Sequence, residues 1–264
     1  MKRINGKVIW ITGASSGIGE ALAYELDKKD CKLILSSRKE DQLQRVKNNC
    51  SHSENVCVLP LDLENFEIMS RKAKEAISFF GHVDILINNA GISQRSLIMD
   101  TDFEVYKKLM DVDYLGTVAV TKAILPHFVE RRSGHFATVT SLMGMFSSPY
   151  RSGYCGAKHA LHGFFDALRL EHEKDGISVT LVCPGFIATD VAKNALKGDG
   201  SAQNTDDDAT KNGLSVSELA KKMVRAMEKD KMEAYIGRKE ILAIYIKRFF
   251  PKLLHKIVLK SEVR

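Results

Sequence analysis

A glycine-rich turn near the start of the chain constrains the fold more than any other feature. It reads Thr12-Gly13-Ala14-Ser15-Ser16-Gly17-Ile18-Gly19 and follows a short apolar run, Lys7–Thr12. An amphipathic helical pattern, Ile18–Lys29, comes directly after it. Three glycines between a strand and a helix allow a tight turn, close approach of the backbone to a pyrophosphate, and close helix–strand packing. Such a turn can be a turn and nothing more, but this placement favours a phosphate cradle at a helix N-terminus.

Strand and helix patterns alternate along the rest of the chain. Alternation of this kind predicts βαβ units and a doubly wound parallel sheet with helices on both faces, an α/β fold of the Rossmann type. One such domain is expected over residues 1–240, and no internal repeat is visible. After the first strand and helix, the expected elements are Lys32–Ser36, Glu40–Asn49, Val56–Leu61, Phe66–Phe80, Asp84–Asn88, a helical region 103–131, Gly134–Thr140, a helix 152–174 and Ser178–Cys183.

Composition places the chain among ordinary globular proteins. It has 264 residues, of which 44% are hydrophobic and 27% charged, enough for one sizeable core. No apolar run reaches the roughly 18 residues of a membrane span, and we expect no signal peptide. The five cysteines and eight histidines show no metal-ligand spacing, so we expect reduced thiols, a cytoplasmic location and no bound metal. His159 and His162 are expected to be ordinary helix residues.

The end of the second strand indicates which nicotinamide cofactor fits the cradle. A carboxylate there would hold the ribose hydroxyls of NAD, but the chain has Ser36-Ser37-Arg38-Lys39. Arg38 is placed to bind a 2′-phosphate, which favours NADP(H), although it can also be a solvated residue near a helix start. Asp62 and Leu63 are predicted to lie near the adenine. The other residues predicted to bind the cofactor are Gly13, Ser15, Ser16, Gly17, Ile18, Gly19, Asn89, Ala90 and Gly91.

Tyr154 and Lys158 are the candidate catalytic pair. Residues four apart on a helix share a face, and a lysine ammonium beside a phenol favours the phenolate, which makes a tyrosine a usable proton donor and acceptor. Ser141 follows a predicted strand and can hydrogen-bond a substrate oxygen. A Tyr-x-x-x-Lys pair alone is usually an ordinary exposed pair. With the glycine turn, Asn88-Asn89-Ala90-Gly91 and Ser141 in this order, it predicts carbonyl–alcohol redox chemistry.

These motifs together resemble the short-chain dehydrogenase/reductase superfamily over about residues 6–236. Asp111–Thr117, Leu125-Pro126 and Tyr150-Arg151-Ser152 are similar to a subgroup of reductases related to 11β-hydroxysteroid dehydrogenases. The resemblance implies Tyr154 as acid/base, Lys158 on the nicotinamide ribose and Ser141 as oxyanion partner. It also implies that Pro184, Gly185 and Thr189 lie near the carboxamide, and that homodimers or homotetramers form through two long helices.

One residue departs from the family pattern. The family usually has asparagine where this chain has Asp113, and there it supports a helix irregularity whose carbonyl holds a water in a proton relay to the lysine. Aspartate keeps the shape of asparagine and lacks its donor. A charged Asp113 is expected to lie near Lys158. We therefore include Asp113 among the candidate catalytic residues.

Two segments lie outside the strand–helix pattern. Residues 198–213 are polar and glycine-punctuated, and we expect a mobile loop that serves as a substrate lid or is a plain surface insertion. Residues 241–264 carry six basic residues against Glu262, a net charge of +5 of the chain's +6, so the basic charge does not indicate a nucleic-acid partner. Their apolar residues share one helical face, and Pro251 must interrupt or start a helix. This segment either covers the substrate cleft or a subunit interface, or attaches peripherally to an anionic membrane.

The sequence therefore predicts an NADP(H)-dependent oxidoreductase acting on a ketone, aldehyde or secondary alcohol. The alternative is a non-catalytic protein that binds NADP(H) as a sensor or scaffold, and Asp113 is the residue that favours it.

Overall fold

Seven parallel strands form the centre of the described structure, a computed structural model that covers residues 4–205 and 208–260. Their order is β3-β2-β1-β4-β5-β6-β7, so the sheet extends in opposite directions from β1 and β4. A crevice at such a reversal is where open α/β sheets bind ligands. The strands are β1 (Val8–Thr12), β2 (Lys32–Ser36), β3 (Val56–Val58), β4 (Ile85–Asn88), β5 (Gly134–Val139), β6 (Ile177–Pro184) and β7 (Glu233–Ile236).

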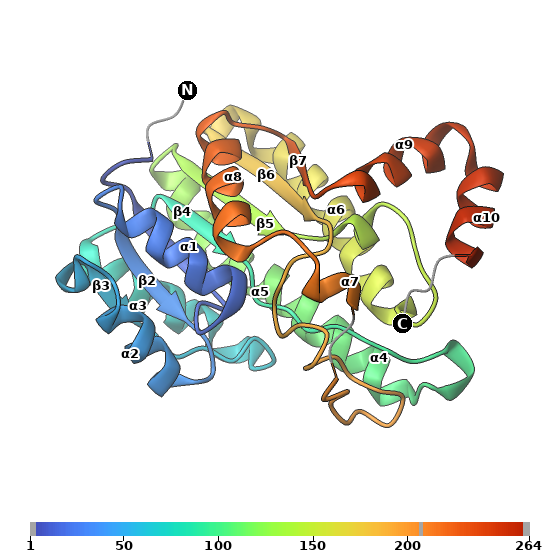
Figure 1. The fold of residues 1–264 in the computed structure, drawn as a ribbon. Helices are drawn as coiled ribbons and strands as arrows, with labels where there is room; N and C mark the ends of the chain where they lie inside the picture. Colours follow the sequence, from blue (N-terminus) through green and yellow to red (C-terminus); the bar gives the residue numbers. More distant parts are fainter. Residues whose placement is uncertain (1–3, 206–207, 261–264) are drawn as a thin grey trace.

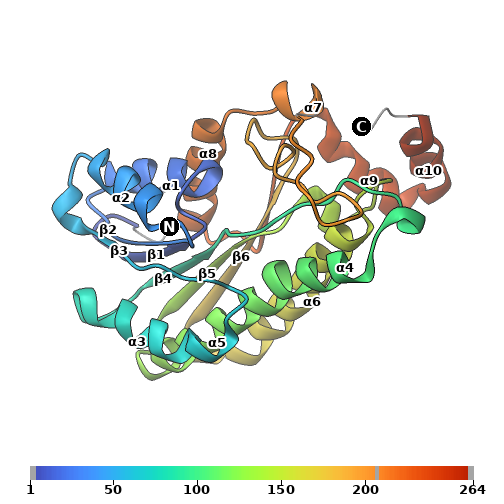
Figure 2. The ribbon, with the colours of Figure 1, turned by 90° about the horizontal axis from the view of Figure 1, so that it is seen from below.

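Helices cover both faces of the sheet, as the alternating pattern predicts (Figures 1 and 2). One face carries α1 (Gly17–Asp27), α2 (Glu40–Asn48) and α8 (Val216–Glu228). The other carries α3 (Met69–Phe80), α5 (Gly116–Glu130) and α6 (Ser152–His172). The doubly wound α/β prediction is confirmed.

Strand β1 shows why both faces are covered. All five of its residues are buried, and successive side chains point to opposite faces. Ile9 and Ile11 pack in the core under α1 and α8, whereas Val8 and Trp10 pack in the core under α3, α5 and α6. A continuous apolar run is therefore what a parallel strand between two helix layers requires.

The helical region predicted at 103–131 is not one regular helix. It consists of α4 (Phe103–Leu109), a π-helical turn η4 (Met110–Leu115) and α5. The widened turn contains Asp113, whose side chain accepts a hydrogen bond from Ile92 N at 2.7 Å. Such turns are frequent at functional sites.

Other boundaries also differ from the predictions. β3 ends at Val58 and not at Leu61, although Leu59 N still donates to Leu35 O at 2.9 Å and Leu61 N to Ser37 O at 3.0 Å. Helix α8 and strand β7 are not among the predicted elements. α8 begins after Ser215, whose hydroxyl accepts from Glu218 N at 3.2 Å and caps the helix.

Of the segment 198–213, the structure describes residues 198–205 and 208–213, and these contain one short helix, α7 (Asp208–Lys211). Its first part is tied to its surroundings by backbone hydrogen bonds: Asp102 N donates to Gly198 O at 2.9 Å, and Gln203 N donates to Ala195 O at 2.8 Å. No strand of the sheet includes any of its described residues.

The C-terminal segment folds as two helices beyond β7. They are α9 (Leu242–Phe249) and α10 (Pro251–Lys260), so Pro251 starts a helix as its restricted backbone allows. Both lie at one end of the molecule, past the β6–α6 side of the sheet (Figures 1 and 2). No helix within residues 4–205 and 208–260 is both long and apolar enough to cross a membrane.

Candidate functional site

A cavity of about 430 Å³ opens at the carboxyl ends of the central strands. Loops after β4, β5 and β6 contribute to its wall, and so do α6 and the C-terminal helices. The lining includes nine predicted site residues: Ile18, Asn89, Gly91, Ser141, Tyr154, Lys158, Pro184, Gly185 and Thr189. Ile92 and Val139, near them in the chain, also line it.

The glycine turn lies beside this cavity and is packed against the loop after β4. Gly13 has φ +66°, and a Cβ there would lie 2.7 Å from Ala90 Cα. A Cβ on Gly19 would lie 2.2 Å from Gly13 O. Both positions therefore require glycine, the first for its left-handed backbone and close packing, the second for packing alone.

Asn89 fastens the two loops together. Its Nδ2 donates to Thr12 O at 3.0 Å and to Gly13 O at 3.1 Å. In return, Thr12 Oγ1 accepts from the backbone N of Asn89 at 3.0 Å and of Ala90 at 3.2 Å. The Asn-Asn-Ala-Gly motif thus fixes the shape of the glycine turn from the neighbouring strand.

Arg38 lies at the surface after β2, where the sequence analysis places a 2′-phosphate. Its side chain is 59% exposed, and Nη1 lies 3.7 Å from Glu64 Oε2. Lys108 Nζ lies 2.5 Å from that same carboxylate oxygen. One carboxylate shared by two cations leaves net positive charge at this position.

Some predicted cofactor residues do not reach the cavity. Asp62 and Leu63 lie after β3, where Asp62 Oδ1 accepts from Glu64 N at 3.1 Å and Leu63 is buried beneath Gly116. Ser15, Ser16 and the three glycines also lie outside the cavity lining, next to Ile18 and Thr189, which line it.

Tyr154, Lys158 and Ser141 are brought to one cavity wall, as predicted. Lys158 Nζ lies 5.6 Å from the centre of the Tyr154 ring and 3.4 Å from Val139 O. Ser141 Oγ accepts from Met143 N at 3.1 Å. The Ser141 hydroxyl hydrogen is donated to no atom of the described residues, so it remains available for a substrate oxygen.

Asp113 is in contact with Lys158, as expected for a charged residue at this position. Its Oδ2 lies 3.3 Å from Lys158 Nζ, and the exposed fractions of the two side chains are 0% and 5%. Burial raises the pKa of Asp113, and the Lys158 charge opposes this. Burial disfavours the ammonium of Lys158, but Asp113 and then Tyr154 outweigh it, so the pKa of Lys158 is raised. Lys158 is therefore a cation in a buried ion pair.

The start of α6 is held by a residue that the sequence analysis missed. Gln94 is fully buried, and its Oε1 accepts from Gly153 N at 2.8 Å, one residue before Tyr154.

Two arginines also line the cavity without having been predicted. Arg95 Nη1 donates to Ser93 Oγ at 2.9 Å, and Arg151 Nη1 donates to Ser148 Oγ at 3.1 Å.

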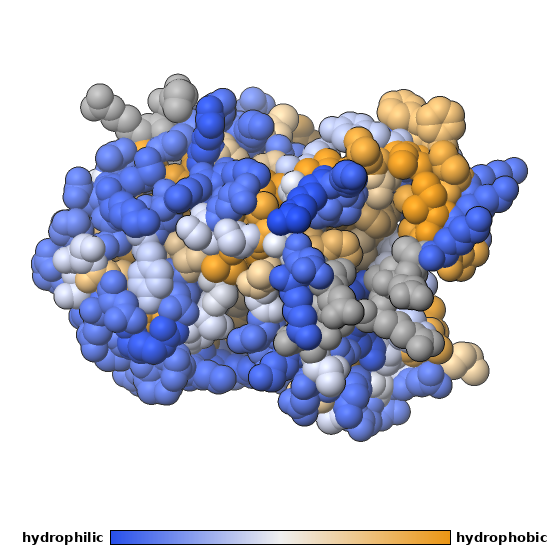
Figure 3. Space-filling view, in the orientation of Figure 1, coloured by the Kyte–Doolittle hydropathy of each residue, from blue (hydrophilic) through white to orange (hydrophobic). Residues whose placement is uncertain are grey.

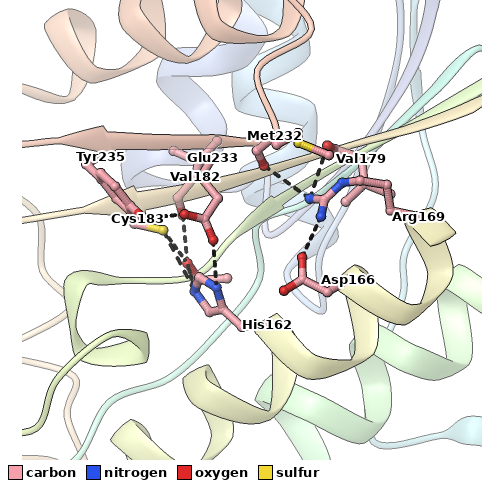
Figure 4. Close-up of polar contacts among 10 residues, drawn as sticks. His162, Asp166, Arg169, Val179, Val182, Cys183, Met232, Glu233 and Tyr235 are labelled. Atoms are coloured by element: carbon pink, nitrogen blue, oxygen red, sulfur yellow. Dashed lines mark hydrogen bonds and ion pairs between the residues drawn. The ribbon is translucent and has the colours of Figure 1, made fainter. Parts of the chain in front are cut away.

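A polar cluster surrounds His162, which projects from α6 (Figure 4). His162 Nε2 lies 3.2 Å from Thr140 Oγ1 and 3.8 Å from Cys183 Sγ, and Nδ1 lies 3.6 Å from Glu233 Oε1. Tyr235 donates to the other oxygen of Glu233. Burial lowers the pKa of His162, and Glu233 opposes this. Because Thr140 precedes Ser141, the cluster braces the strand end that carries the serine, so His162 is more than an ordinary helix residue.

The C-terminal helices close one side of the cavity. Ala243, Leu254, Ile257 and Val258 line it, and Lys247 Nζ donates to Met145 O at 2.8 Å. These residues of the segment therefore cover part of the cleft, whereas the membrane alternative concerns its outward-facing side chains. No group of three or more potential metal ligands occurs among residues 4–205 and 208–260.

Comparison with known proteins identifies the family. The model of the short chain dehydrogenase family matches residues 7–200, so the chain belongs to this family. Human dehydrogenase/reductase SDR family member 7 is 41% identical over 251 residues, which cover 92% of this chain and 74% of the human protein. Dehydrogenase/reductase SDR family member 7B of Bos taurus is 36% identical over 97% of this chain and 81% of its own.

Two solved structures share the fold. A short chain dehydrogenase/reductase from Burkholderia phymatum in complex with NAD has a TM-score of 0.85 and 21% identity, covering 96% of each chain. A short chain dehydrogenase from Burkholderia cenocepacia J2315 in complex with NADP has a TM-score of 0.81 and 23% identity, covering 99% of this chain and 100% of the other.

Proposed function

We propose that the protein is an NADP(H)-dependent oxidoreductase that interconverts a ketone or aldehyde and the corresponding alcohol. The observation that carries this proposal is the shared cavity wall of Ser141, Tyr154 and Lys158 next to the glycine turn. Membership of the short chain dehydrogenase family and the nicotinamide cofactors in its structural neighbours support it.

The residues present fit a dinucleotide. A Cβ at Gly13 or Gly19 would collide with the protein's own atoms, so both glycines allow the turn to pack closely against itself and the loop after β4. The N-terminus of α1 follows this turn directly, and its N–H groups are suited to phosphate. Ile18, Asn89, Gly91, Pro184, Gly185 and Thr189 would hold the nicotinamide end, with Ser15, Ser16, Gly17, Ala90, Asp62 and Leu63 toward the phosphates and adenine. The bound cofactor supplies or accepts the hydride at the substrate carbon.

The protein's own residues carry the proton and orient the substrate. In reduction, the Tyr154 hydroxyl donates its proton to the carbonyl oxygen as that oxygen gains charge. Ser141 donates a second hydrogen bond to the same oxygen, because its hydroxyl hydrogen has no other acceptor among the described residues. Lys158 stabilises the resulting phenolate with its ammonium charge, and Asp113 holds Lys158 in place. In alcohol oxidation these transfers run in reverse.

The decisive experiment compares NADPH oxidation by the unmodified protein and Tyr154→Phe over a panel of ketones and aldehydes. Turnover is expected in the first and its loss in the second, with cofactor affinity nearly unchanged. Tyr106→Phe is the matched control, because Tyr106 hydrogen-bonds Ser152 at 3.1 Å and does not line the cavity. Retained turnover in Tyr154→Phe would exclude the mechanism.

A second candidate is an NADP(H)-binding sensor or scaffold without turnover. The buried Asp113–Lys158 pair favours it, since a carboxylate beside the ammonium offsets its charge, and the lysine then stabilises a phenolate less. Cofactor binding without turnover on the whole panel, in the presence of correct folding, would support this candidate.

Assembly and location belong to the same proposal. We expect a homodimer or homotetramer formed through α5 and α6, and a cytoplasmic catalytic domain over residues 1–240. Sedimentation velocity tests the first expectation and localisation of the tagged full chain tests the second.

A further inference from the structure

The C-terminal helices expose more large apolar side chains than any other part of the described structure. Figure 3 shows apolar surface over α9 and α10. We call this surface the tail apolar face. Its members and their exposed fractions are Leu242 60%, Tyr245 52%, Phe249 70%, Phe250 63%, Leu253 49% and Ile257 44%.

The helical spacing explains why these side chains share a surface. Leu242, Tyr245 and Phe249 stand three and four residues apart along α9, and Phe250, Leu253 and Ile257 repeat that spacing into α10. Leu254 and Val258 occupy the adjoining side of α10 and line the cavity. One side of the apolar stripe of α10 therefore lines the protein's own cavity. The other side is not covered by any of the described residues.

A second exposed apolar segment lies at the same end of the molecule. Ile98 and Met99, in the short turn η3 (Ile98–Asp100), are 70% and 93% exposed, and Phe103, the first residue of α4, is 75% exposed. Figures 1 and 2 both place the segment leading into α4 at the end that carries α10. Exposed apolar groups of this size at one end of a protein mark an interaction surface.

The charge beside the tail apolar face decides between the possible partners. Arg248, Lys252, Lys256 and Lys260 are exposed, and no carboxylate of residues 4–205 or 208–260 pairs with them. The last three stand four residues apart and form a basic side of α10, which also contains Leu259, 67% exposed. A second copy of the chain would bring the same cations into an isologous contact and repel. Anionic lipid headgroups complement them, while the adjoining apolar side chains enter the interface.

We propose that this end of the molecule docks on an anionic lipid bilayer, with α10 lying in the headgroup region and the tail apolar face directed into the lipid. Ile257 belongs to this face and also lines the cavity, so the lipid contact adjoins the cavity wall. The docking does not depend on the proposed reductase activity and is measured without it.

A tryptophan reporter tests the docking directly. The chain has one tryptophan, Trp10, which is fully buried. Phe249→Trp adds an exposed indole to the face and keeps its apolar character, so folding is retained. On addition of phosphatidylcholine/phosphatidylserine vesicles, we expect a blue shift of its emission. Leu170→Trp on α6, at a position 78% exposed, is the control and should show no shift.

Co-sedimentation with vesicles measures the two contributions separately. The unmodified protein should bind phosphatidylserine-containing vesicles about tenfold more tightly than pure phosphatidylcholine, and rising salt should weaken this binding. Phe249→Ser/Phe250→Ser and Lys252→Gln/Lys256→Gln should each reduce binding about tenfold. Lys221→Gln/Lys229→Gln on the α8 side is the charge-matched control and should bind like the unmodified protein.

Three results would overturn the proposal. The first is equal, weak binding of the unmodified protein to both kinds of vesicle. The second is an unchanged Phe249→Trp emission on anionic vesicles. The third is a lipid-free oligomer that Phe249→Ser/Phe250→Ser dissociates in sedimentation velocity, which would assign the face to a second copy of the chain.

Discussion

Lys158 Nζ and Asp113 Oδ2 face each other at 3.3 Å, with both side chains closed off from solvent. The other oxygen of Asp113 accepts from Ile92 N at 2.7 Å. The carboxylate therefore links the π-helical turn, the loop after β4 and the catalytic face of α6. A buried ion pair of this kind costs much to break by removing one partner, because the other charge is left uncompensated.

Replacing Asp113 by asparagine should leave kcat unchanged or raise it. Asparagine keeps an oxygen for Ile92 N, and Lys158 then acts on Tyr154 without a competing carboxylate, while the loss of the buried ion pair should lower the free energy of unfolding. Steady-state kinetics of Asp113→Asn and of Asp111→Asn, a neighbour in the same turn, measure this. A loss of more than tenfold in kcat, about 1.4 kcal/mol of barrier, with folding intact would show that the aspartate has a role of its own.

Arg38 should determine the choice of cofactor. Since Arg38 shares Glu64 with Lys108 and is largely exposed, Arg38→Ala should weaken NADPH binding by about 1–3 kcal/mol and NADH binding much less. Titration of both cofactors against the unmodified protein, Arg38→Ala and Lys39→Ala as control provides the measurement. Equal affinities of the unmodified protein for NADPH and NADH would contradict the assignment.

Gly19 should tolerate no side chain. A Cβ there would lie 2.2 Å from Gly13 O, so Gly19→Ala should lower the free energy of unfolding by about 1–3 kcal/mol and weaken cofactor binding. Gly163→Ala on α6 is the control, because a Cβ there meets no atom within 4 Å. That variant should gain up to about 1 kcal/mol from helix propensity. Equal effects of the two substitutions would refute this view of the turn.

His127 should make stability depend on pH below neutrality. Its Nε2 accepts from Val83 N at 3.2 Å, which requires an unprotonated nitrogen, and burial lowers its pKa. The unfolded chain therefore binds more protons between the lowered folded pKa and the ordinary value near 6.5, and stability falls as pH decreases through that window. Urea unfolding at pH 7 and pH 5 should show a smaller loss in His127→Gln than in the unmodified protein. His255→Gln, in the exposed tail, should show the full loss.

Local sequence patterns alone predicted much of the fold. The continuous apolar run of β1 and the glycine turn after it predict a strand between two helix layers, and Ile11 and Trp10 lie in separate cores as period-two alternation requires. The same applies to Tyr154 and Lys158, because helical spacing alone places them on one face.

Contacts between distant segments were beyond the sequence analysis. Gln94 caps α6 across 59 residues, and no local pattern marks it. His162 did leave a signal, because it follows Lys158 by one helical turn on the same face of α6, but its partners Thr140 and Glu233 come from other strands. In the tail, periodicity predicts an apolar stripe, whereas only the fold shows that Leu254 faces the cavity and Phe249 does not.

The C-terminal segment should therefore contribute to stability and to substrate affinity even when no lipid is present. Deleting residues 241–264 removes Ala243, Leu254, Ile257 and Val258 from the cavity wall and uncovers Leu142 and Phe146, which pack against Leu254. The melting temperature should fall and KM for an apolar carbonyl substrate should change. Leu254→Ala should reproduce part of this loss, about 2–5 kcal/mol for a buried leucine. Phe249→Ser should stay within about 0.5 kcal/mol, because that side chain is exposed. A truncated protein as stable and active as the whole would mean that the cavity does not depend on its C-terminal wall.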